Sequence, residues 1–149
     1  DFTVITPIDL SNFYVHRQDR FNQIDWNLQK SRIESAYYKY NRAKTRVDST
    51  GVGDPIYEDL HRKGLNVEPY KFNEQSRRDL LVNLQLCIEQ QKIRIPDDEV
   101  LINELKSFSY VLKESGKVKM EVPDNMHDDC VMSLAIAWSA VANPVWLIG

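Results

Sequence analysis

Hydrophobic positions are densest near the end of the sequence, in residues 126–138, which read Met-His-Asp-Asp-Cys-Val-Met-Ser-Leu-Ala-Ile-Ala-Trp. Counted from Asp128, small and apolar residues recur at offsets that return to one face of a helix with 3.6 residues per turn. The residues on this face are Val131, Ala135 and Trp138. Asp129 is rotated from the stripe by about 100°. We therefore predict a buried helix and expect Asp128, rather than Asp129, to face an enclosed site.

Upstream of this helix the pattern alternates short β-forming stretches with helical stripes. Mixed strands and helices of this kind favour an α/β domain with three layers around a mixed sheet. The predicted order is an antiparallel hairpin in residues 2–17, a helix after Asp25, a strand at 43–47, a helix at 54–63, a strand at 67–72, helices at 76–88 and 97–108, a hairpin at 110–122 and the final helix.

Start signals are explicit in two of these helices. Ser76 to Asp79 has the form of a capping box, in which Ser76 caps the helix. Asp97 is the expected cap of the next helix, whose apolar stripe includes Val100 and Leu101. Both signals fix the predicted phase of the helical faces.

Composition limits the classes of protein to consider. With 149 residues, 42% of them hydrophobic and 28% charged, we treat 1–149 as one globular domain. The apolar stretch at 131–142 is shorter than the roughly 20 residues that span a bilayer, so neither a membrane span nor a secretion signal is expected. Cys87 and Cys130 lie in apolar helical patterns and are expected to be buried thiols. A net charge of −3 requires any DNA binding to come from local basic patches.

Asp48 is the second acidic position of interest. It closes the strand predicted at 43–47 and precedes a glycine-flanked turn, Ser-Thr-Gly-Val-Gly, at 49–53. Carboxyl ends of strands are where α/β sheets place functional side chains. An Asx turn that holds the loop is the local alternative for Asp48, and helix capping is the alternative for Asp128 and Asp129.

Carboxylates from a strand end and a helix start suit a hard divalent cation, Mg²⁺ or Mn²⁺, because both elements are rigid and the ligands are oxygens. Asp48, Asp128 and Asp129 are the predicted catalytic and metal-binding residues. Two such ions roughly 3.5–4 Å apart activate a water and stabilise the leaving 3′-oxygen in phosphodiester hydrolysis. Carboxylates at these positions could therefore form a metal site that hydrolyses a phosphodiester.

Other side chains have accessory roles to consider. His127 could orient a water or support the ligands from behind, or it could be a surface residue. Arg77 and Arg78 could contact phosphate or could simply be solvated. The second hairpin could be a flap that contacts DNA, or a solvated edge whose charges discourage aggregation. Its lysines are Lys113, Lys117 and Lys119.

A set of motifs in this order resembles the C-terminal nuclease domain of tailed-phage terminase large subunits, the motors that package viral DNA. The match covers nearly the whole chain. The motifs are Asp-Phe-Thr-Val-Ile at 1–5, Asp-Trp at 25–26, Val-Asp-Ser-Thr-Gly-Val-Gly-Asp-Pro at 47–55, Tyr-Lys-Phe at 70–72, Ser-Arg-Arg-Asp-Leu-Leu at 76–81, Ile-Arg-Ile-Pro at 93–96 and Met-His-Asp-Asp-Cys-Val-Met-Ser-Leu-Ala at 126–135.

The resemblance implies a ribonuclease-H-like mixed sheet flanked by helices, with an added β-hairpin before the last helix. It also implies a metal-dependent endonuclease that cuts concatemeric double-stranded viral DNA during genome packaging. The implied partners are double-stranded DNA, an ATPase domain that this chain lacks, the small terminase subunit and the portal. The implied location is the cytoplasm of the host cell.

Asp48 matches the family's acidic residue at the end of the fourth strand, and Asp128 or Asp129 matches the one that opens the last helix. The family's first catalytic aspartate precedes the segment that begins here at Asp1. We therefore expect the first strand and its ligand to be missing and the metal site to be incomplete. A non-cleaving DNA-binding or docking module, and a resolvase-like or integrase-like nuclease, are the alternative functions.

Overall fold

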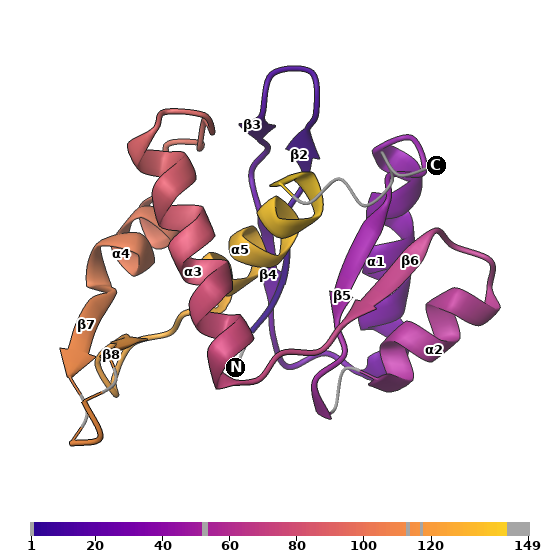
Figure 1. Ribbon diagram of the computed structural model, residues 1–149. Coiled ribbons are helices and arrows are strands. Elements are labelled where there is room, and N and C mark those ends of the chain that lie inside the picture. Colours follow the sequence, from indigo (N-terminus) through magenta and orange to yellow (C-terminus); the bar gives the residue numbers. More distant parts are fainter. Residues whose placement is uncertain (1, 52–53, 113, 117, 143–149) are drawn as a thin grey trace, which may run out of the picture.

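The computed structural model describes residues 2–51, 54–112, 114–116 and 118–142. This part of the chain contains eight strands and five helices, and Figure 1 shows their arrangement. In chain order they are β1 (Thr3–Ile5), β2 (Ile8–Asp9), β3 (Tyr14–Val15), β4 (Asp19–Phe21), α1 (Trp26–Lys39), β5 (Thr45–Asp48), α2 (Asp54–Arg62), β6 (Val67–Tyr70), α3 (Glu74–Glu89), α4 (Glu99–Ser107), β7 (Ser109–Leu112), β8 (Val118–Glu121) and α5 (Asp129–Ala142). The predicted order is confirmed, except that the first predicted strand is divided into β1 and β2 and that one strand lies outside the predicted segments.

The added strand is β4, which pairs antiparallel with β1 so that Thr3 lies opposite Phe21. The prediction missed it because two of its three residues, Asp19 and Arg20, are charged and give no strand-like alternation. Strands β2 and β3 continue the same two segments as a short hairpin. The N-terminal region therefore contains two antiparallel pairings, where the sequence predicted one hairpin.

The strands at the centre of the domain form two separate pairs. Beside the β1–β4 pair, β5 and β6 run parallel, with Val47 opposite Pro69. Among the described residues no hydrogen bonds join β1 to β5, and each of these strands has one described neighbour. Pro69 lacks a ladder donor and lies in β6 at the outer side of its pair, as expected for proline. The mixed sheet is thus present as two halves.

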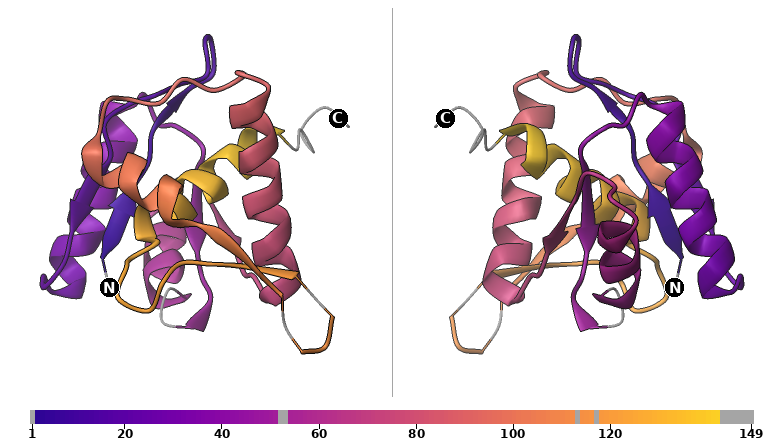
Figure 2. Two further views of the ribbon diagram at one scale, coloured as in Figure 1. Left: turned by 90° about the vertical axis from the view of Figure 1, so that its left-hand side faces the viewer. Right: turned by 90° about the vertical axis from the view of Figure 1, so that its right-hand side faces the viewer.

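Helix α5 connects the two halves, because it packs against both β1 and β5. Helices α3 and α4 cover the outer side of α5, whereas α1 and α2 lie on the opposite face of the strands (Figure 2). The β7–β8 hairpin projects from the end of the molecule near the start of α5. The result is the layered α/β arrangement that the sequence predicted.

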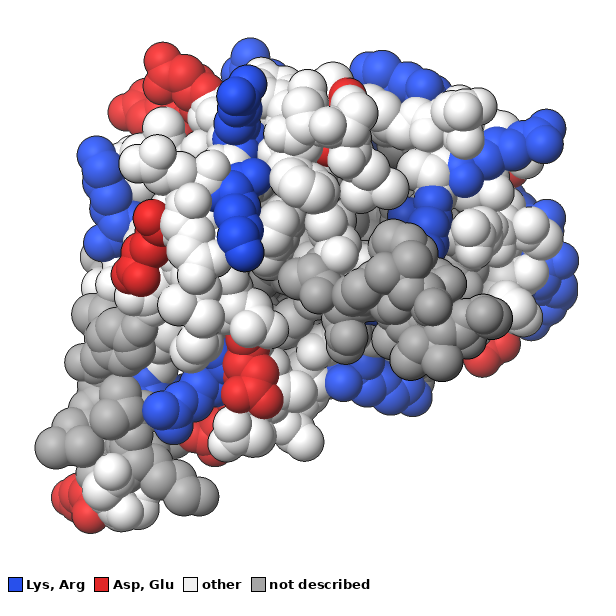
Figure 3. Space-filling model, turned by 45° about the horizontal axis from the view of Figure 1, so that its top comes forward, with Lys and Arg blue, Asp and Glu red and all other residues white. Residues whose placement is uncertain are grey.

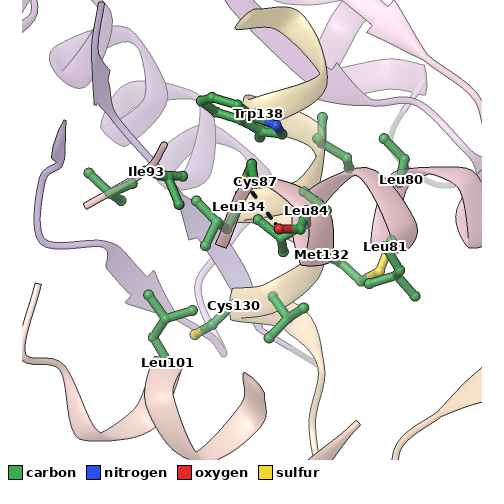
Figure 4. Close-up of a cluster of buried hydrophobic side chains, with 14 residues drawn as sticks. Leu80, Leu81, Leu84, Cys87, Ile93, Leu101, Cys130, Met132, Leu134 and Trp138 are labelled. Carbon is green, nitrogen blue, oxygen red and sulfur yellow. Dashed lines mark hydrogen bonds between the residues drawn. The ribbon is translucent and has the colours of Figure 1, made fainter. Parts of the chain in front are cut away.

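The main hydrophobic core surrounds α5 (Figure 4). The predicted face with Val131, Ala135 and Trp138 is buried, but so are Cys130 and Leu134 at other angles around the helix. Layers on both sides explain why α5 is apolar around most of its circumference. A second cluster fills the space between the β5–β6 pair and the helices on the other face. Its buried members are Tyr37, Ile56, Leu60, Leu65 and Val67.

The two thiols are free and buried, as predicted. Burial raises the pKa of Cys87 to about 11. Burial, together with the nearby Glu104 carboxyl, raises the pKa of Cys130 to about 12. Both thiols are therefore protonated at neutral pH and behave as small apolar core residues.

The predicted helix starts need correction. Asn73, not Ser76, caps α3: the Ser76 N–H donates to Asn73 Oδ1 at 2.9 Å, and the Asn73 N–H donates to Ser76 Oγ at 2.9 Å. A capping box is present, but it begins three residues earlier than predicted. Asp98, not Asp97, caps α4 by accepting from the N–H groups of the first turn. Several polar residues lie near the start of each helix, so the sequence alone does not show which of them is the N-cap.

The phase of α4 also differs from the predicted stripe. Leu101 is fully buried, but Val100 is 42% exposed. The residue one turn beyond Leu101 is Glu104, and it is only 4% exposed. A charged residue therefore occupies the buried face of this helix.

None of the helices in the described residues is long and apolar enough to cross a membrane.

Replacing Leu101 with alanine should lower the free energy of unfolding by about 2–5 kcal/mol, because deleting buried methyl groups leaves a cavity. Val100→Ala, on the exposed side of the same helix, is the matched control and should change it by less than about 0.5 kcal/mol. Urea unfolding monitored by circular dichroism measures both values. Equal losses would contradict the phase of α4.

Candidate active site

A cleft of about 1370 Å³ separates the two halves of the sheet. Residues of β1 and β5 line its sides, residues of α1 line one face and residues of α5 line the other. Asp48, Asp128 and Asp129 all line this cleft. The fold thus brings together the two acidic regions that the sequence singled out, although about 80 positions separate them along the chain.

Asp48 is the last residue of β5 and is exposed. Its Oδ1 accepts the Thr50 N–H at 2.8 Å, so the Asx turn considered from the sequence is present. The next N–H, that of Ser49, donates to Tyr70 O at 3.0 Å and ties the strand end to β6. A carboxylate has two oxygens with several acceptor positions, so the turn leaves Asp48 able to bind a cation as well.

Asp128 and Asp129 lie at the start of α5. The Met132 N–H donates to the Asp128 carbonyl oxygen at 2.8 Å, which makes Asp128 the residue at the N-cap position. Its carboxylate pairs with the Arg77 guanidinium of α3. The Asp129 carboxylate accepts the Phe2 N–H at 3.1 Å. Both side chains therefore bond to other elements at the rim of the cleft.

The carboxylate that caps α5 comes from α4 instead. Glu104 Oε2 accepts the N–H of Val131, the third residue of α5, at 3.0 Å. Burial raises the pKa of the Glu104 carboxyl, and hydrogen bonding by Val131 and Cys130 opposes this rise. The capping role that was the alternative for Asp128 or Asp129 thus belongs to Glu104, which the sequence did not point to. The sequence feature that could have pointed to Glu104 is its spacing: it lies three residues after Leu101, on a helix face that is otherwise apolar.

A second buried polar residue holds the same turn. Gln18 donates through Nε2 to the Cys130 carbonyl oxygen at 2.9 Å and to Thr6 Oγ1 at 2.7 Å. Thr6 Oγ1 in turn lies 2.6 Å from Ser133 Oγ, which donates to the Val4 carbonyl oxygen at 2.9 Å. This chain of hydrogen bonds fixes the first turns of α5 against β1.

His127 lies beside the acidic pair, as predicted, and is about half exposed. Its Nδ1 is 3.6 Å from Asp129 Oδ2, and its ring meets the Phe2 ring edge-on with centroids 5.3 Å apart. A protonated imidazole at this distance would be close enough to orient the Asp129 carboxylate.

The predicted basic residues divide into three groups. Arg77 is partly buried against Asp128 and reaches the Met120 carbonyl oxygen at 3.5 Å. Arg78 is exposed, and Lys119 pairs with Glu121 at 2.6 Å; together with Arg77 these residues line a small pocket between α3 and β8. Lys113 and Lys117 lie outside the described residues. On the face shown in Figure 3, basic and acidic side chains are interspersed.

The chemistry of the cleft suits a hard divalent cation, because the candidate ligands are all carboxylate oxygens. Among the described residues, however, no three His, Cys, Asp or Glu side chains gather closely enough to hold an ion. Asp48 and the acidic pair on α5 line the same cleft, but the described residues alone do not complete a metal site.

The two halves of a mixed sheet, the helices on both faces and the acidic cleft define a ribonuclease-H-like α/β domain. Residues 1–140 match the family model described as the terminase RNaseH-like domain, and the chain belongs to this family. It is 34% identical over 140 residues to the large terminase subunits of Thermus phage G20c and Thermus virus P23-45. The match spans 93% of this chain but 29% of each of these relatives.

Solved structures agree with the family assignment. The large terminase nuclease of the thermophilic phage G20c with bound magnesium superposes with a TM-score of 0.85 at 34% identity, over 94% of this chain and 75% of that one. The large terminase nuclease domain of Thermus phage P74-26 superposes with a TM-score of 0.82 at 26% identity, over 97% and 82% of the two chains. The nuclease-domain fold predicted from the sequence motifs is confirmed.

Replacing Arg77 with glutamine should lower the free energy of unfolding by about 1 kcal/mol, because the partly buried Asp128 carboxylate loses its charged partner. Arg78→Gln, at the exposed neighbouring position, should change it by less than about 0.5 kcal/mol. Chemical unfolding at low salt measures the difference. Identical effects of the two substitutions would show that the Arg77–Asp128 pair does not stabilise the fold.

Proposed function

We propose that this chain is the nuclease domain of a phage large terminase, which hydrolyses concatemeric double-stranded DNA with the help of divalent cations during genome packaging. The observation that carries the proposal is the convergence of Asp48, Asp128 and Asp129 on one cleft in a member of the terminase RNaseH-like family. If these aspartates had no common role, there would be no reason for the end of a strand and the start of a helix to bring them to the same cleft.

The proposed cofactor is Mg²⁺ or Mn²⁺, with two ions in the complete site. The large terminase nuclease of phage G20c has been solved with bound magnesium, cobalt and zinc. In this chain, the hard oxygen ligands of the cleft favour Mg²⁺ or Mn²⁺ over softer ions. Ions bound there would polarise a phosphodiester and supply a water nucleophile at neutral pH.

Within the acidic pair, Asp129 is better placed than Asp128 to hold a cation. The positive charge beside Asp128 is Arg77, and a bound cation would have to share or replace that contact. Asp129 is held through a neutral N–H from Phe2, and among the described residues no Lys or Arg pairs with it. We therefore propose that Asp48 and Asp129 provide the main ligands and that Asp128 joins them when Arg77 turns toward DNA phosphate.

We propose that the cleft can accept one further strand. The cleft-facing edges of β1 and β5 lie on either side of it, with α1 and α5 on its two faces, so an extended segment there could hydrogen-bond to both strands. Such a strand would join the two halves into one sheet. It would also bring the additional acidic ligand that the family resemblance implies next to Asp48 and Asp129.

The partners of the whole protein are part of the proposal. Because the chain spans 29% of the length of its curated relatives, we propose that an ATPase domain accompanies it in the packaging motor. The small terminase subunit and the portal are proposed as further partners, and the host cytoplasm as the location. For DNA contact, the proposed residues are Arg77, Arg78 and Lys119 at the junction of α3 and β8, together with Lys113 and Lys117 from the sequence alone.

Asp48→Asn and Asp129→Asn should each reduce plasmid cleavage in Mn²⁺ by at least about 100-fold, because loss of a direct ligand should cost more than loss of a supporting residue. The assay uses the longest natural form of the protein that contains residues 1–149. Asp124→Asn is the matched control, since Asp124 is exposed and lies outside the residues that line the cleft. Melting temperatures within a few degrees of the parent protein would show that the fold is intact.

The same preparation separates the alternatives. Salt-sensitive DNA binding without any cleavage by the unsubstituted protein would contradict the nuclease proposal and favour a binding or docking module. Preferential cutting of branched over linear DNA would favour a resolvase-like enzyme. Full cleavage by Asp129→Asn would remove that residue from the site.

A further inference from the structure

We propose that Glu104 is a positioning residue of the metal site, which acts by capping α5 from outside so that the carboxylates at the helix start remain available to the cleft. The inference rests on the proposed function for the role of the ligands. The capping contact itself is independent of that function.

An α-helix begins with backbone N–H groups that have no partner within the helix. In most helices the side chain of the N-cap residue accepts one of them, usually that of the third helical residue. At the start of α5 the N-cap residue is Asp128, whose short acidic side chain is well suited to this role. If it capped the helix, however, its oxygens would turn back toward Val131 and away from the cleft.

The structure replaces this local cap with a distant one. Glu104 Oε2 lies 3.0 Å from the Val131 amide nitrogen and accepts its hydrogen bond. The Glu104 side chain is 4% exposed, and its carboxyl lies near the amide and thiol of Cys130 as well. A buried carboxylate at this position interacts favourably with the partial positive charge of the helix N-terminus. Asp128 is thereby able to pair with Arg77 at the rim of the cleft.

The burial of Glu104 indicates that its carboxyl has a specific role. A buried ionisable group costs free energy unless bonded, and an apolar residue would pack against Leu101 and Cys130 without that cost. The glutamate occupies the buried face of α4, one turn beyond Leu101, and its carboxyl reaches the core residues Cys130 and Val131. Its hydrogen bond crosses from α4 to the turn that carries Asp128 and Asp129. Gln18 holds the carbonyl side of the same turn through Cys130.

The first arm of the test measures the turn directly. In Glu104→Ala, hydrogen exchange of the Val131 amide should accelerate by about tenfold or more relative to amides in the middle of α5, because the amide loses its hydrogen-bond acceptor. Glu104→Gln keeps an oxygen acceptor and should recover most of the protection. Glu99→Gln, at an exposed position of the same helix, should have no effect. Unchanged protection of Val131 in Glu104→Ala would overturn the proposal.

The second arm measures Mn²⁺ binding by electron paramagnetic resonance, without any cleavage assay. Glu104→Ala should weaken binding by about 10–100-fold, the range found when residues that support metal ligands are replaced. Leu101→Ala removes buried packing from the same helix and should leave the affinity of the folded protein unchanged. An equal loss in both variants would show that Glu104 acts only through general stability.

The two proposals fail differently. If the unsubstituted protein binds no Mn²⁺ at Asp48 and Asp129, the metal-site proposal is wrong, and with it the positioning role. The exchange result would then still establish Glu104 as the cap of α5. If Mn²⁺ binds at those residues and Glu104→Ala leaves its affinity unchanged, the positioning role alone is wrong.

Discussion

The start of α5 is the constraint on which the rest of the structure depends. This turn must be buried enough to anchor the most apolar helix of the chain, yet its two aspartates must reach the edge of a solvent-filled cleft. The structure meets both demands by supplying the turn's hydrogen bonds from elsewhere. Glu104 accepts an N–H, Gln18 donates to a carbonyl, and Arg77 pairs with Asp128. The helix can then lie across β1 and β5 with its acidic end facing outward.

The arrangement concentrates negative charge in a small region. Asp48, Asp128 and Asp129 line one cleft, with the Glu104 carboxyl close behind α5. The helix N-terminus and Arg77 offset part of this repulsion. Bound cations would offset more, so metal binding and folding are expected to be coupled. Arg77, at the junction of α3 and β8, lies beside the same carboxylates. Its guanidinium therefore occupies the region where bound metal ions and DNA phosphate would act.

Much of this could be predicted from the sequence, because it depends on periodicity. The order of elements, the buried face of α5 and the three aspartates all followed from local patterns. Three features could not be predicted in this way. β4 is short and charged, so it depends on its partner β1 rather than on its own alternation. The caps of α3 and α4 lie among several polar residues. Glu104 gains its role only through a contact with a turn 27 positions away.

The central claim is that the carboxylates of β5 and α5 together hold divalent cations in the cleft. Titrating ¹⁵N-labelled protein with Mn²⁺ tests it most directly, because the paramagnetic ion broadens the amide resonances nearest to it. The account predicts that signals of Phe2, residues 48–50 and residues 128–130 disappear first and together, at Mn²⁺ concentrations that leave the signals of the more distant acidic residues Glu34 and Glu58 unaffected. Uniform broadening over all acidic surfaces, or loss of the α5 signals without those of residues 48–50, would contradict it.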